Sequence, residues 1–203
     1  MAETRKRIRE KPEVRRARII GEAFRIIGEF GYHGFTVQGL AERCGLTNAG
    51  LLHYFGSKDD LLLALLDEVE LRGEEYVTPL VVALDHDAPG PDEMPTAIVR
   101  IMCAMIEPVV QHPEEARFVF VLRSEAMEPS HPAHNWFMAR DRETIDLLVH
   151  MLGALDNECH PVARQLVAAL NGLVGQWLQS NMEFNLMAEA ESMFSLILTR
   201  PFG

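Results

Sequence analysis

Apolar residues recur with the spacing of an α-helix along almost the whole chain. In the first segment they fall at i, i+3, i+4 and i+7, at Ile20, Ala23, Phe24 and Ile27. This spacing puts them on one face of a helix. We expect that helix to run from about Pro12, a residue tolerated in a first helical turn, to Phe30, with Gly31 as its end.

Three shorter periodic segments follow, and each begins with a capping residue. The side chains of Thr36, Thr47 and Ser57 can accept a hydrogen bond from the first turn of a helix. Gly45 and Gly56 lie between these segments, where a positive φ favours glycine. We therefore expect helices over residues 36–44, 47–55 and 57–76.

The rest of the chain is also predicted to be helical, after a loop over residues 85–95 that is rich in proline. Residues 96–110 are apolar on almost every side, which is typical of a buried central helix. The run FVFVL at 118–122 would also fit a buried strand, but no second strand exists to pair with it. Further helices are expected over residues 114–128, 133–152, 161–181 and 186–199. The predicted fold is all-α, with about nine helices.

Composition and charge narrow the class of protein. The chain has 203 residues, of which 48% are hydrophobic and 24% charged, so it is not a disordered chain or a fibre. Residues 1–58 contain 11 basic and 6 acidic residues, a net charge of +5, whereas the rest contains 8 basic and 24 acidic residues, a net charge of −16. Only the basic end can approach a polyanion favourably.

Several classes are disfavoured by what the sequence lacks. It has no uninterrupted run of roughly 18 apolar residues and no apolar segment behind its basic N-terminus, so neither a membrane span nor a secretory signal is predicted. The three cysteines are widely spaced and odd in number, which suits a reducing cytoplasm. No nucleophile elbow, P-loop or HExxH motif is present, so we predict no enzyme and no cofactor.

The stretch from 36 to 55 has the layout of a helix-turn-helix, in which a turn containing glycine joins two short helices. The second helix starts with Thr47 and Asn48, and in this motif the N-terminal residues of the second helix reach base edges in the major groove. The alternative is a three-helix packing unit without DNA contact. The local positive charge favours DNA binding.

The segment TVQGLAERCGLTNAGLLHYFGSKDDLLLALL, residues 36–66, resembles the DNA-binding domain of TetR-family transcriptional repressors. Residues at consensus or similar positions are Gly45, Thr47, Leu51, Tyr54, Phe55, Ser57 and Lys58. The resemblance implies a basic arm at 1–11, a DNA-binding domain at 12–57, and a ligand-binding and dimerisation domain at 58–203. It also implies a cytoplasmic homodimer that binds a palindromic operator and is released by a small, largely apolar effector.

Roles follow from the resemblance position by position. It implies phosphate contacts for Thr36, Thr47, His53, Tyr54 and Lys58. His53 stands where the family usually has tyrosine, and Tyr54 where it usually has histidine. Asn48 replaces a common lysine and can pair with adenine through two hydrogen bonds. Gly50 replaces a common threonine or serine, which permits close approach to the groove or leaves the helix looser, and Leu52 replaces a common tyrosine.

The body offers candidates for an effector site and a dimer interface. Apolar and adaptable side chains that can line a pocket are Met102, Met105, Ile106, Phe118, Leu122, Trp136 and Phe137. The last two helices carry an apolar seam that can complete a four-helix bundle with a second copy, at Leu166, Leu170, Leu173, Trp177, Phe194 and Ile197. Both sets also fit an ordinary core. Arg123 is either an anchor for an anionic ligand or a paired surface residue.

Four residues within a stretch of ten suggest a metal site: Glu125, Glu128, His131 and His134. Pro129 and Pro132 break the helical register between them, so no common helix face holds all four, and no metal is predicted.

The basic arm either reaches the minor groove of DNA or is a solubilising tail. For the whole chain, two other functions compete with a ligand-responsive regulator. One is a ligand- or metal-sensing helical protein without operator binding, and the second is a helical enzyme, which the missing catalytic motifs disfavour.

Overall fold

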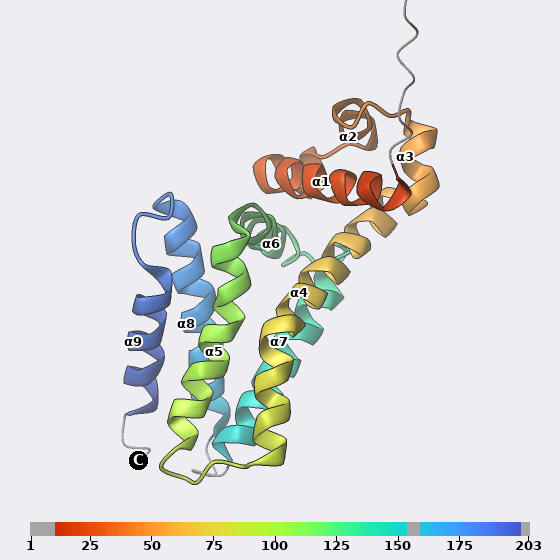
Figure 1. Cartoon of the computed structure of the whole chain (residues 1–203). Helices are drawn as coiled ribbons and strands as arrows, with labels where there is room; N and C mark the ends of the chain where they lie inside the picture. The colour runs from red at the N-terminus through yellow and green to blue at the C-terminus, as the bar shows by residue number, and fades with distance from the viewer. Residues whose placement is uncertain (1–10, 154–158, 200–203) are drawn as a thin grey trace, which may run out of the picture.

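The computed structural model describes residues 11–153 and 159–199, and within these ranges the chain forms nine α-helices and no strand. The expected all-α class is therefore confirmed. The basic arm at 1–11 lies, apart from Lys11, outside the described residues. Figure 1 shows a small head made of α1, α2 and α3, a long α4 that descends from it, and a body formed by the remaining helices.

The head is built by the capping residues that the sequence predicted. Helices α1 (Pro12–Gly34), α2 (Val37–Arg43) and α3 (Asn48–Phe55) are followed by α4 (Lys58–His86). Thr36, Thr47 and Ser57 each accept a hydrogen bond from a backbone N–H in the first turn of α2, α3 and α4. The three predicted N-caps are thus confirmed.

Gly31 bends α1 instead of ending it. Its φ of 72° lies in the left-handed region, and one further turn follows, to Gly34. A Cβ at this position would collide with the carboxylate of Glu125. Glycine is required here for its backbone conformation and for the close approach of α6.

Helix α4 is longer than expected, because it continues past Tyr76 and through Pro79 to His86. Proline removes one N–H from the helical ladder, and Pro79 lies on the exposed side of α4. On the other side Val77, Leu80 and Leu84 pack against the body core. Burial of these side chains offsets the missing hydrogen bond.

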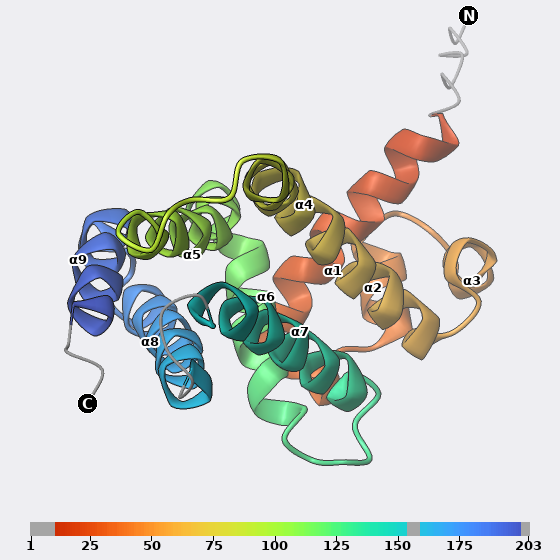
Figure 2. The same cartoon turned by 90° about the horizontal axis from the view of Figure 1, so that it is seen from below.

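The body comprises the last five helices: α5 (Met94–Gln111), α6 (Pro113–Glu125), α7 (His134–Leu152), α8 (Cys159–Gln179) and α9 (Leu186–Leu198). Residues 118–122 are helical, as the sequence predicts. Seen from below, α5, α8 and α9 group on the side away from the head (Figure 2). In the described part of the chain, α5 alone is long and apolar enough to cross a membrane, a test that core helices of soluble proteins also pass.

Two apolar clusters hold the fold together. The first joins α1, α2, α3 and the beginning of α4 to α6, and Phe24 meets Phe118 edge to face with ring centroids 5.0 Å apart. The second fills the body between α5, α7, α8 and α9. The first turns of α4 belong to the first cluster and its later turns pack against the second, so α4 packs with both parts. The expected domain boundary after residue 57 stays a prediction.

Candidate functional site

The exposed end of the head is the N-terminus of α3. Thr47 Oγ1 accepts a hydrogen bond of 3.0 Å from the backbone N–H of Gly50, and Thr36 Oγ1 accepts one of 3.1 Å from Gly39. Each threonine hydroxyl keeps its proton available for a further acceptor such as a phosphate oxygen. Thr36, Thr47, Asn48 and His53 are exposed to solvent.

Two further candidates on α3, Gly50 and Tyr54, are less exposed. Tyr54 is half-buried against the first cluster, and its ring lies 6.0 Å from that of His53. A Cβ on Gly50 would meet only Thr47 Oγ1, at 3.1 Å, which is a tight contact with the cap itself. Glycine therefore leaves the cap undisturbed, although its helix propensity is lower than that of threonine or serine.

Lys58, for which a phosphate contact is expected, contacts its own chain in the structure. Its Nζ donates a hydrogen bond of 2.8 Å to the carbonyl oxygen of Tyr32 and lies 4.1 Å from the centre of the Tyr32 ring. Burial lowers the pKa of this ammonium group. Lys58 therefore ties α4 to the end of α1, and a phosphate contact, which stays a prediction, requires it to turn outward.

A polar junction joins the head to the body around Tyr32. The backbone N–H of Tyr32 donates a hydrogen bond of 2.7 Å to Glu125 Oε2 at the end of α6, and the Tyr32 hydroxyl donates to Asp59. Burial and the neighbouring carboxylate raise the pKa of Tyr32. Sequence reasoning missed this junction, because 93 residues separate Tyr32 and Glu125.

The residues considered as a possible metal site have other partners. His131 Nδ1 accepts a hydrogen bond of 3.1 Å from the backbone N–H of Ala133, and His134 Nδ1 lies 2.8 Å from the carbonyl oxygen of Ala126. Glu125 is engaged by Tyr32. Among the residues that the structure describes, no group of three or more histidine, cysteine or acidic side chains could hold a metal ion.

A cavity of about 330 Å³ lies in the body between α4, α5, α6, α7 and α8. Three of the expected lining residues, Met102, Met105 and Trp136, are on its wall. The other four are not, because they are buried within the apolar clusters: Ile106, Phe118, Leu122 and Phe137. Helical periodicity identifies buried positions but does not tell a cavity wall from a helix contact.

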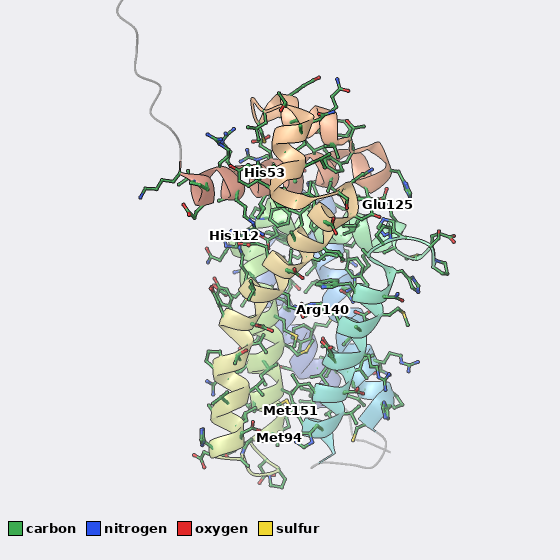
Figure 3. The ribbon with its side chains drawn as sticks, turned by 90° about the vertical axis from the view of Figure 1, so that its right-hand side faces the viewer. His53, Met94, His112, Glu125, Arg140 and Met151 are labelled. Carbon is green, nitrogen blue, oxygen red and sulfur yellow. The ribbon has the colours of Figure 1, made fainter. Side chains whose placement is uncertain are left out.

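Charged residues also line this cavity, and among them only Arg123 was a candidate from the sequence. Arg123 Nη1 lies 2.9 and 2.8 Å from the two carboxylate oxygens of Asp141. Of the two roles considered for Arg123, an anchor for an anionic ligand or a paired residue, the structure shows the paired residue. Arg140 Nη1 lies 3.7 Å from Glu70 Oε1. Figure 3 shows Arg140 in the middle of the body, between the levels of Glu125 and Met151.

Glu115 is the buried acid of the cavity wall. It is 7% exposed, and its carboxylate pairs with Arg72 of α4. Burial raises the pKa of Glu115 to about 7, although the charge of Arg72 opposes this shift. In the sequence, Glu115 resembles an ordinary acidic residue of a first helical turn, so periodicity alone does not reveal its burial.

The expected dimer seam is largely internal. Leu166, Leu173, Trp177 and Phe194 are buried in the body cluster of a single chain, and the indole N–H of Trp177 donates a hydrogen bond of 3.1 Å to the carbonyl of Phe184. Their own chain covers these four side chains, because α8 packs on α7 and α9, and α9 packs on α5. Their assignment to an interface stays a prediction, which this burial does not support. Of the two remaining seam residues, Leu170 lines the cavity and Ile197 is half-buried.

Residues 19–65 match the model of the tetR family of bacterial regulatory proteins. The matched segment covers α2, α3 and the beginning of α4, together with most of α1. The transcriptional repressor AcnR of Corynebacterium glutamicum is 39% identical over 69 residues, which are 34% of this chain and 37% of the repressor. This similarity therefore spans just over a third of the relative.

Solved structures extend the likeness of the fold to the body. A TetR-like regulator from Rhodococcus sp. RHA1 matches 95% of this chain and 97% of its own with a TM-score of 0.75 and 19% identity. AibR, solved in complex with isovaleryl coenzyme A and operator DNA, matches 90% of this chain and 97% of its own with a TM-score of 0.69 and 20% identity. The family model thus assigns residues 19–65 to the tetR family, and the solved structures show that the fold of the whole described chain is that of TetR-like regulators.

All seven expected DNA-contact residues fall inside the segment matched by the family model. The described helices around them form the helix-turn-helix that the sequence predicted. The residues that line the cavity and the last two helices all lie outside the matched segment.

Proposed function

We propose that this protein is a DNA-binding transcriptional regulator, and specifically a repressor that a small, largely apolar effector releases from a palindromic operator. The observation that carries the proposal is the exposed N-terminus of α3, capped by Thr47 and presenting Asn48, inside the family-matched segment. His53 lies at the opposite end of the molecule from Met94 and Met151 (Figure 3), so the body does not cover this surface.

Charge supports this orientation on DNA. The net charge is +5 for residues 1–58 and −16 for the remainder, so the head is drawn to phosphate while the body is repelled. Asn48 is proposed as a residue that reads a base. Phosphate contacts position the protein but carry no sequence information, and they are proposed for Thr36, Thr47, His53, Tyr54 and Lys58.

The cavity is the proposed effector site, and α4 is the element that connects it to the head. The α4 helix begins at Lys58 beside Tyr32, and fifteen residues later Gly73 is on the cavity wall. AibR was solved with both isovaleryl coenzyme A and operator DNA. A ligand that shifts α4 here would change the placement of α3, and a coupling of about 1–3 kcal/mol lowers DNA affinity roughly 5–150-fold.

A palindromic operator requires a dimer, and we propose that the second copy packs on the exposed sides of α8 and α9. Gln165, Ala168 and Gly172 lie on the solvent side of α8, and Leu196 of α9 is 63% exposed. Small residues allow close approach of helices, and an exposed leucine gains from being covered. We propose that this dimer acts in the cytoplasm and has no catalytic activity.

The test is binding of the purified chain to the DNA upstream of its own gene, followed by fluorescence anisotropy. We expect saturable binding that is specific over random DNA and weakens strongly as salt rises from about 50 to 200 mM. The two α3 helices should contact half-sites about 34–36 Å apart, or a multiple of this. A dimer that binds ligands but shows no preference for any selected DNA would instead support a sensor without an operator.

A further inference from the structure

The chemistry of the cavity wall carries an inference about the effector itself, which rests on the function proposed above. Most of the wall is apolar, and it includes the aromatic rings of Phe120 and Trp136. A volume of about 330 Å³ is at the lower end of the range for small-molecule sites. The cavity therefore suits a compact molecule with one substantial apolar part.

Charge on the wall is unbalanced, with five carboxylates against two guanidinium groups. The two guanidinium groups are already paired, because Arg123 is held by Asp141, and Arg140 by Glu70. An anionic ligand would meet no uncommitted guanidinium among these described wall residues and would be repelled by the surplus of carboxylates. The charged residues of the wall are Glu70, Glu74, Glu115, Arg123, Arg140, Asp141 and Glu143.

Glu115 is the carboxylate best placed to receive a ligand. It is 7% exposed and belongs to the cavity wall, whereas its partner Arg72 does not line the cavity and approaches from the side of α1 and α4. A single guanidinium leaves part of the acceptor capacity of a buried carboxylate unused. Because Glu115 is buried, water screens the attraction between its carboxylate and a cation less than it would at the rim of the cavity.

We propose that the cavity takes an apolar molecule carrying one positive charge, a quaternary ammonium or a protonated amine, and that the carboxylate of Glu115 receives that charge. The apolar part of the ligand then lies against Met102, Met105 and Phe120. A cation at Glu115 competes with Arg72 for the same carboxylate. Binding therefore weakens a contact between α6 and α4, the helix that leads to the head.

Three probes that share a 4-phenylbutyl group test the inference: trimethyl(4-phenylbutyl)ammonium, 4-phenylbutan-1-ol and 5-phenylpentanoate. Their affinities for the full chain are measured by isothermal titration calorimetry at about pH 8. We expect the cation to bind at least about tenfold more tightly than the alcohol, and the carboxylate to bind most weakly. Equal affinities for all three probes, or tighter binding of the carboxylate, would overturn the proposal.

Glu115→Gln isolates the role of the buried acid. Affinity for the cation should fall about tenfold while affinity for the alcohol changes less than about twofold, since only the charge is lost. The matched control is Glu114→Gln on the same helix, because Glu114 pairs with Arg25 and does not line this cavity. That control should bind the cation normally. An equal loss for cation and alcohol in Glu115→Gln would refute the assignment.

A pH series on the unaltered chain decides the matter if Glu115→Gln does not fold. The quaternary ammonium keeps its charge at every pH, whereas Glu115, with a pKa of about 7, changes from mostly protonated near pH 6 to mostly ionised near pH 8. Affinity for the cation should rise several-fold across this range, and affinity for the alcohol should stay constant. A flat profile for the cation would contradict the proposal.

One more variant distinguishes the pH effect of Glu115 from that of other charged groups near it. Arg72 and Glu68 of α4 interact with its carboxylate, and the imidazole of His112 lies on the same cavity wall. The pH series is therefore repeated with His112→Asn, which removes the imidazole and leaves the acid in place. The rise in affinity for the cation should persist in this variant, and its disappearance would assign the pH effect to His112 and overturn the role of Glu115.

The same preparations are tested for operator binding without any probe, so that the two proposals can fail separately. Specific DNA binding together with a cavity that prefers the carboxylate probe refutes the cationic effector and leaves the repressor proposal standing. Absence of specific DNA binding refutes the repressor proposal, whichever probe the cavity prefers.

Discussion

The backbone N–H of Tyr32 donates a 2.7 Å hydrogen bond to Glu125 Oε2, which joins the end of the head to the end of α6. The neighbouring Gly31 has a φ of 72°, and a Cβ there would collide with the same carboxylate. The bend in α1 and the position of Glu125 therefore depend on each other. This contact is a direct polar link between the two parts of the molecule.

Removing this link should destabilise the chain measurably. For Glu125→Ala we expect the free energy of unfolding to fall by about 1.5–3 kcal/mol, the range for a hydrogen bond to a charged group. Chemical denaturation of the two proteins measures the difference. Glu128→Ala, three residues further on and exposed to solvent, is the matched control and should unfold like the unaltered chain. Equal stability of Glu125→Ala and the control would mean that the bond contributes nothing.

Lys58→Ala should have two separate effects. The loss of the hydrogen bond to the Tyr32 carbonyl should lower the free energy of unfolding by about 1.5–3 kcal/mol. If the ammonium group turns to a phosphate on DNA, affinity should also fall equally for all sequences, and the slope of log affinity against log salt should decrease by about 1. Reduced stability with an unchanged salt slope would leave Lys58 a purely structural residue.

Local chemistry made the head predictable, whereas contacts between distant segments did not follow from the sequence. Thr36, Thr47 and Ser57 act on backbone groups within three residues of themselves, so the sequence is sufficient to place those caps. The position of Lys58 depends on Tyr32, 26 residues away, and no periodicity reports that contact.

In the body, too, local features were predictable and contacts between distant segments were not. Period 3.6 identifies its helices, yet the sequence predicts too short an α4, because burial opposite Pro79 cannot be weighed locally. The periodicity also finds Trp177 and Phe194 but does not tell whether the same chain or a second copy covers them. Glu115 escapes sequence analysis because nothing in its neighbourhood along the chain reveals that Arg72 and the cavity enclose it.

The dimer proposal gives opposite expectations for buried and exposed positions. Leu196→Arg, on the solvent side of α9, should give a folded monomer in equilibrium sedimentation. Val82→Arg, at a position of α4 that is 46% exposed, is the matched control and should remain dimeric. Trp177→Asp should instead unfold the body, because it buries a charge inside one chain at a cost of several kcal/mol. A dimeric Leu196→Arg would show that α9 is not the interface.

Asn48→Ala should change sequence preference more than general affinity. Its amide has both a donor and an acceptor, the pair that adenine presents in the major groove, and a good bidentate contact is worth about 1–3 kcal/mol. Affinity for the best operator should fall by that amount, affinity for random DNA much less, and the salt slope should not change because no charge is lost. Operator selection with both proteins measures this. An identical consensus from both would show that Asn48 reads no base.

Glu115 should make stability depend on pH near neutrality. Its pKa is raised from 4.5 to about 7 in the folded chain, so between these values the folded state binds more protons than the unfolded state. With respect to this group, stability is then greatest below about pH 4.5 and decreases as pH rises through 7, by up to about 3 kcal/mol in total. Glu115→Gln cannot ionise and should lack this decrease.

Other groups titrate in the same range, and burial lowers the pKa of His131, which acts in the opposite direction. The informative quantity is therefore the difference between the two proteins in unfolding free energy, measured from about pH 5 to pH 8. That difference should shift in favour of Glu115→Gln as pH rises; a constant difference would mean that Glu115 keeps an ordinary pKa in the folded chain.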